Sequence, residues 1–117
     1  MALSLPDEPR HAHDAADAVQ ALSVVSRERV LPAWVVREVL SELTALLESL
    51  PIALDNVGRG LARSLDVPAL VERPERNPVF QVAACKDHLF AASELLNRAR
   101  TQLEEATRQI QSSANGI

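Results

Sequence analysis

The chain has 117 residues, 47% of them apolar and only 3% aromatic, and a formal net charge of -4, so its length suits one small domain. An acidic chain without a basic run lacks the positive charge with which nucleic-acid binders neutralise phosphates. The shortage of aromatic side chains removes the platforms on which single-stranded bases stack. One cysteine excludes a disulfide framework and a multi-cysteine zinc site within a single chain. The composition therefore argues against nucleic acid as a partner.

The N-terminus has neither the basic nor the apolar segment of a signal peptide. No stretch approaches the ~20 apolar residues that a membrane-spanning helix needs. We therefore expect a cytoplasmic protein without a membrane span. Arg supplies 11 of the 12 basic residues and Ala occurs 18 times, a bias typical of a GC-rich bacterial genome.

The N-terminal region divides into two predicted segments. Residues 1–12 hold two prolines and mixed charge, so we expect an irregular arm. Residues 14–28 predict a short helix, because Ala15, Val19 and Leu22 recur at helical spacing on one narrow face. Acidic residues begin this segment and Arg27 ends it, an order that suits the helix dipole.

The next segment, at about residues 33–66, predicts the first long helix. Its apolar residues are spaced alternately by four and three positions, which is an unbroken heptad: Val36, Leu40, Leu43, Leu47, Leu50, Leu54, Val57 and Leu61. Pro51 interrupts this run, so either one helix kinks there or two helices meet. A turn would have no reason to keep the heptad in phase, and we therefore favour one helix kinked near Pro51.

Residues 67–77 contain two prolines and alternating charge and predict a loop. A second long helix is expected at about residues 78–111, with Pro78 in its first turn. One heptad position of this helix is large and the position three residues later is small, which predicts that leucines of the first helix pack against the small side chains. The large set is Val82, Leu89, Leu96, Leu103 and Ile110, and the small set is Cys85, Ala92, Ala99 and Ala106.

The predicted fold is thus all-α, an antiparallel hairpin of two long helices plus the short N-terminal helix. Residues 13–112 would form one helical domain, and residues 113–117 a frayed tail. Folding the hairpin about its loop places Glu42 near Arg100, Glu48 near Arg98 and Asp55 near His88.

Apolar residues outside the heptads exceed what one short helix can cover, so we expect a homodimer that completes a helical bundle. The alternative is a break at Pro51 that gives a compact monomeric four-helix bundle. The residues that we expect at an interface between molecules are Trp34, Val35, Val39, Leu46, Phe90 and Leu95.

Three residue groups suggest chemistry, and each has a simpler structural interpretation. His11, His13 and Asp17 could bind a metal, but a solvated helix start explains them as well. Cys85 and His88 could form a nucleophile and base, yet Cys85 also suits a small packing position. Arg27, Arg29, Arg37 and Arg108 could form a basic cluster, which Glu28 and Glu38 dilute.

Gly58-Arg59-Gly60 is too short for a phosphate loop and follows no predicted strand, so weakening of the helix or close helix packing explains it better. No catalytic motif is present in the sequence, and we predict no catalytic residue, metal or cofactor. The expected function is a non-catalytic protein–protein interaction module that binds itself, another protein or both. The alternative is a small regulatory protein, antitoxin-like or associated with DNA.

Overall fold

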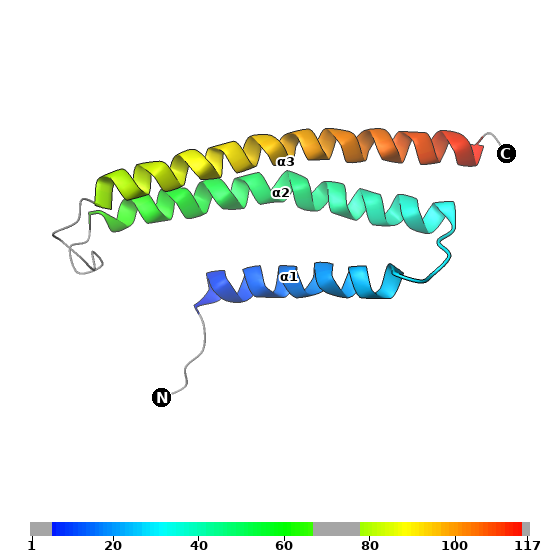
Figure 1. The fold of residues 1–117 in the computed structure, drawn as a ribbon, viewed down its shortest axis with the longest axis horizontal. Helices are drawn as coiled ribbons and strands as arrows, with labels where there is room; N and C mark the ends of the chain where they lie inside the picture. The colour runs from blue at the N-terminus through cyan, green and yellow to red at the C-terminus, as the bar shows by residue number, and fades with distance from the viewer. Residues whose placement is uncertain (1–5, 67–77, 116–117) are drawn as a thin grey trace, which may run out of the picture. The chain divides into compact units, whose positions relative to one another are not determined.

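The computed structural model describes residues 6–66 and 78–115, and the side chains of residues 79–112 in the second range. These residues form three α-helices and no strand: α1 (Asp7–Ser26), α2 (Ala33–Ser64) and α3 (Pro78–Asn115) (Figure 1). The predicted all-α class is therefore confirmed. The predicted loop at residues 67–77 and the last two residues of the predicted tail lie outside the described residues.

Helix α1 begins at Asp7, so the prediction of an irregular arm is wrong for residues 7–12. Two nearby prolines suggested irregular structure, but the first four N–H groups of a helix have no intrahelical partner. Pro9 therefore costs little in the first turn. Asp7 and Glu8 stabilise the positive end of the helix dipole, and Asp7 accepts a hydrogen bond of 2.8 Å from Arg10.

The contacts divide the chain into one unit of Met1–Pro32 and another of Ala33–Ile117. In the first unit, α1 ends at Ser26, whose hydroxyl donates a 2.7 Å hydrogen bond to the Leu22 carbonyl. No described residue of α1 is buried. Val24 and Val25 each keep 56% of their surface exposed.

Helix α2 continues through Pro51, so the chain forms one long helix here and not two. Pro51 has no N–H to donate to the Leu47 carbonyl, and the packing of the helix must compensate for this missing bond. The helix ends where Ser64 donates its hydroxyl to the Leu61 carbonyl, and the next two N–H groups close a tighter turn. The kink itself stays a prediction.

Helix α3 reaches Asn115, four residues beyond the expected end, so residues 113–115 of the predicted frayed tail are helical. The sequence there is Ser-Ser-Ala-Asn, and nothing in it prevents a helix before Gly116. Gly is the residue that most commonly follows the end of a helix.

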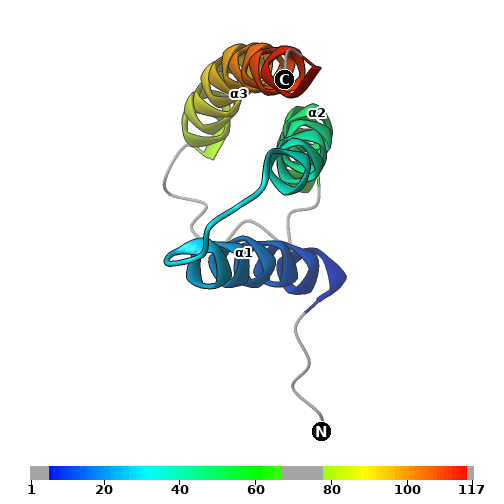
Figure 2. The same cartoon turned by 90° about the vertical axis from the view of Figure 1, so that its right-hand side faces the viewer.

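Helices α2 and α3 lie side by side and antiparallel (Figures 1 and 2). The register differs slightly from the prediction, because Arg100 approaches Glu48 at 4.0 Å where we expected Arg98. Asp55 was expected near His88, and the ion pair that it forms is with Arg59 of its own helix, at 3.0 Å.

The side of α3 that meets α2 also differs from the prediction. The large heptad set does face α2, since Val82 is only 8% exposed and Leu89 lies against Gly58. The small set is divided, because Cys85 and Ala99 are exposed while Ala92 and Ala106 are half-buried. A polar set with the same sevenfold spacing also borders the contact with α2: Lys86, Ser93, Arg100 and Thr107.

Candidate functional site

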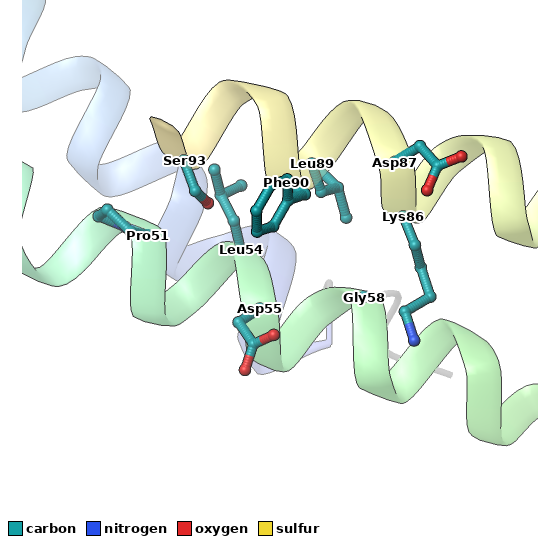
Figure 3. A pocket seen from close by; sticks show the side chains of 9 residues that line it. All are labelled: Pro51, Leu54, Asp55, Gly58, Lys86, Asp87, Leu89, Phe90 and Ser93. Carbon is teal, nitrogen blue, oxygen red and sulfur yellow. The ribbon is translucent and has the colours of Figure 1, made fainter. Parts of the chain in front are cut away.

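A groove of about 380 Å³ opens between α2 and α3, near the middle of the hairpin (Figure 3). Pro51, Leu54, Asp55 and Gly58 line it from α2, and the α3 residues that line it are Lys86, Asp87, Leu89, Phe90 and Ser93. Its size suits a small organic group or one or two side chains of another protein.

Local sequence explains why the groove forms here. A Cβ atom added at Gly58 would lie 3.3 Å from Cδ1 of Leu89 and 3.7 Å from Cγ of Lys86. The missing side chain therefore lets α3 approach α2 closely at this level. About two turns away, the short side chains of Pro51 and Ser93 line the groove and leave it open.

The groove combines an apolar interior with charged edges. Leu54 and the Phe90 ring occupy its middle, and the Lys86 side chain extends from α3 toward α2 (Figure 3). Phe90 is nevertheless 69% exposed, so the groove is open to solvent. Such a surface can accept an apolar side chain with a charged neighbour.

The six residues expected at an interface between molecules divide into two classes. Trp34, Phe90 and Leu95 are exposed by 62%, 69% and 62%, while Val35, Val39 and Leu46 are half-buried. Of the six, Phe90 alone lines the groove. The structure therefore does not gather the six residues into one site.

Helix geometry assigns these residues to sides of the hairpin. Each residue advances by about 100° around the helix axis. Measured from Gly58 and Val82, which lie in the contact, one side of the hairpin carries a set that we call the apolar face: Val35, Val39, Leu46 and Val57 of α2 with Ala92, Leu95 and Ala99 of α3. Trp34 and Phe90 lie on the opposite side, together with the groove.

The residues that suggested metal or nucleophile chemistry do not form such a site among the described residues. His13 pairs with Asp17 at 3.2 Å on exposed side chains, and His11 joins no described ion pair. Within residues 6–66 and 78–112, no three His, Cys, Asp or Glu side chains gather where they could hold a metal ion. Cys85 carries a free thiol, and both it and His88 are exposed.

The two glycines differ in their surroundings, and the arginines belong to different units of the chain. Gly58 is buried against α3, whereas a Cβ atom at Gly60 would meet nothing within 4 Å. Arg37 is half-buried in the second unit of the chain, while Arg27 and Arg29 belong to the first. Sequence reasoning missed Lys86 and Ser93 as groove residues, although their sevenfold spacing with Arg100 and Thr107 was a readable signal.

Comparison with known protein families, with curated proteins and with solved structures finds no match to this chain. None of the described helices is both long and apolar enough to cross a membrane.

Proposed function

We infer that the protein is a non-catalytic helical interaction module, which presents the sides of its α2–α3 hairpin to another polypeptide. One observation carries this proposal. Val82 is the only apolar side chain among the described residues that is less than 9% exposed, while seven large apolar side chains of the described hairpin remain exposed. A hairpin with so little buried surface lacks most of the apolar burial that stabilises a folded domain.

The energetic argument concerns the side chains that the hairpin leaves in water. Fully burying one large apolar side chain stabilises a protein by ~1.5–3 kcal/mol. Phe80, Phe90, Leu95 and Ile52 are each at least 62% exposed, so most of this stabilisation is unused in the hairpin alone. Single exposed apolar residues are normal, but a long run of them along two helices is typical of an interaction surface.

The proposal can be tested by capture with a tagged chain from the native host. We expect the tagged chain to retain untagged copies, a host protein or both. Val39→Asp combined with Leu95→Asp should abolish retention, because both place a charge on the apolar face. Ala83→Asp serves as the control, since it adds a charge to α3 away from that face. Unchanged retention by the double variant would contradict the proposal.

A small regulatory protein, antitoxin-like or associated with DNA, stays the alternative. Its nucleic-acid form needs Arg27, Arg29 and Arg37 to contact phosphates, and such binding weakens steeply with salt. A titration of duplex DNA at low and at physiological salt tests this form, and no binding at either salt concentration would remove it.

A further inference from the structure

The groove side of the hairpin carries a stripe of three exposed residues of α3, which are Lys86, Phe90 and Glu94. At about 100° per residue they lie about 40°, 80° and 120° around the helix from the buried Val82, so all three turn toward the groove side. Phe90 lines the groove and is 69% exposed (Figure 3). Along the helix the stripe is therefore positive, aromatic and negative, with equal spacing.

The two charges of this stripe have no partner among the described residues. Neither Lys86 nor Glu94 forms an ion pair or a hydrogen bond there, whereas Asp55 of the facing helix is paired with Arg59 at 3.0 Å. Phe90 lies midway between the two charges. If two α3 helices pack antiparallel with a two-fold axis at Phe90, Lys86 of each copy lies opposite Glu94 of the other, which is a complementary contact.

Helix α2 carries a second pair of opposite charges centred at the same level. Glu48 and Arg63 are exposed and lie about 80° and 140° around α2 from Gly58, which is again the groove side. The midpoint between them adjoins Asp55, and Asp55 lines the groove together with Phe90. A single two-fold axis that crosses both helices at this level therefore also places Glu48 of each copy opposite Arg63 of the other.

The other two-fold arrangement would place α3 of one copy over α2 of the second. Lys86 lies beside Gly58, so it would then meet Arg59 of the second copy, and Phe90 would meet Asp55. The first of these contacts brings like charges together, which costs free energy. In the antiparallel arrangement the two Asp55 side chains approach each other near the axis, and the ion pair of each with Arg59 offsets their repulsion.

From this agreement we propose that the groove side joins two copies of the hairpin, with α3 antiparallel to α3, α2 antiparallel to α2 and the two-fold axis at Phe90. The Phe90 ring of each copy packs against the groove of the other and completes its apolar lining. The two apolar faces then point away from each other, so one dimer can hold two partner molecules. This last consequence rests on the proposed function, and the contact between the copies does not.

The contact is smaller than the hairpin. Residues 48–63 and 83–97 span about 23 Å along two helices about 10 Å apart, which gives an area of about 450 Å² on each copy. A stable interface buries about 800 Å² on each partner, so we expect a dissociation constant of about 100 μM or weaker. Capture from the host works at far lower concentrations and therefore reports on the apolar face.

Cysteine cross-linking tests the arrangement in a Cys85→Ala background. Ala83 and Asn97 are exposed and lie seven positions before and after Phe90, so Ala83→Cys together with Asn97→Cys places unlike thiols opposite each other in the two copies. Within one chain these thiols are about 21 Å apart along α3, and a disulfide needs Cα atoms within about 7 Å. Oxidation with glutathione disulfide at a concentration above the expected dissociation constant should give covalent dimers.

The two single-cysteine variants in the same background are the matched controls. In the proposed dimer, identical thiols lie about 20 Å apart across the axis, so neither control should cross-link. Absence of the covalent dimer in the two-cysteine variant, or an equal amount in either control, would overturn the arrangement. Circular dichroism checks that all three variants keep their helix content.

Charge reversal gives an independent measurement by sedimentation equilibrium. Lys86→Glu and Glu94→Lys should each raise the dissociation constant about tenfold, because each reversal acts twice in a two-fold dimer. Combining the two should restore it to within about threefold. Ala91→Glu is the control, since it adds a charge on the side of α3 away from α2 and should change nothing. A combined variant as weak as the single variants would overturn the pairing.

The same variants separate this proposal from the proposed function. Lys86→Glu should lose the dimer and keep the captured partner, while Val39→Asp with Leu95→Asp should lose the partner and keep the dimer. A wild type that stays monomeric at about ten times the expected dissociation constant overturns the second copy, also if Lys86→Glu loses a host protein. Unchanged partner retention by the apolar-face variant overturns the proposed function and leaves the dimer standing.

Discussion

The two halves of the α2–α3 hairpin share one heptad pattern but differ in how tightly they pack. Near the 67–77 segment, Gly58 and Val82 are the only described residues with less than 9% exposure, and Leu89 lies against Gly58. In the other half, Arg100 meets Glu48 at 4.0 Å, and its shielded Nε atom makes no hydrogen bond although Glu104 lies 3.5 Å away. The heptad spacing thus brings the leucine-rich sides of the two helices together. The distance between the helices then depends on the residues beside the leucines, which are the small Gly58 in one half and the long Arg100 in the other.

The largest expected effect comes from a charge in the tight half. Val82→Asp should lower the free energy of unfolding by about 3–5 kcal/mol, because it removes a carboxylate from water at a position that is only 8% exposed. Urea unfolding followed by circular dichroism at a fixed protein concentration measures it. Ala83→Asp adds the same charge on an exposed position one residue later and should cost less than about 1 kcal/mol. Equal losses would show that the tight half is not packed as described.

Pro51 lies between the two halves, and its replacement should stabilise the hairpin. Pro51→Ala restores a donor for the Leu47 carbonyl and improves helix propensity, for an expected gain of about 2 kcal/mol. Hydrogen exchange at residues 47–51 should slow at the same time. Ile52→Ala, an exposed neighbour, is the matched control and should not slow exchange there. A loss of stability in Pro51→Ala would mean that the proline is required by the packing.

Substitution of Gly58 and of Gly60 distinguishes a glycine that is needed for the close approach of α3 from one that only weakens the helix. Gly58→Leu should destabilise the protein by about 1–2 kcal/mol, since a side chain there meets Leu89 and Lys86. Gly60→Leu should stabilise it by up to about 1 kcal/mol, because Gly60 has open space and Leu favours helix. Thermal unfolding of both variants tests the difference in sign, which a purely local propensity effect would not produce.

The smallest effect is expected in the polar half. Arg100→Met removes the contact with Glu48 and should cost about 0.5–1 kcal/mol, since both side chains are partly exposed. Arg108→Met removes the pair with Glu105 within α3 at 2.7 Å and should cost less. Urea unfolding at low and at high salt tests both, and high salt should reduce both losses.

The helices themselves could be predicted from the sequence, because the Val36–Leu61 heptad and Pro78 are strong local signals. The start of α1 could not be predicted, because two prolines close together usually indicate irregular structure. In the structure Pro6 precedes the helix and Pro9 lies in its first turn, where proline is tolerated. On α3, the leucine set has a small stripe on one flank and a polar stripe on the other. Periodicity alone does not show which flank turns toward α2, and the structure places Lys86, Ser93 and Arg100 there.

The groove was less predictable than the helices. The sequence left helix weakening and close packing open for Gly58 and Gly60, and the structure shows close packing at Gly58 alone; the groove depends further on which residues of α3 lie opposite Gly58. That register follows from the contact of Glu48 with Arg100, and the sequence predicted Arg98 instead. A difference of two positions turns a helix by about 200°, enough to change which side chains line a groove.

Trp34 makes the intrinsic fluorescence of the protein report on one end of α2. It is the only Trp, the chain has no Tyr, and the indole ring lies 62% exposed in the first turn of α2. Intrinsic fluorescence therefore reports on the environment of one helix end and is insensitive to the contact around Gly58 and Val82. A fluorescence transition that precedes the transition seen by circular dichroism would measure the fraying of that end, separately from the separation of the two helices.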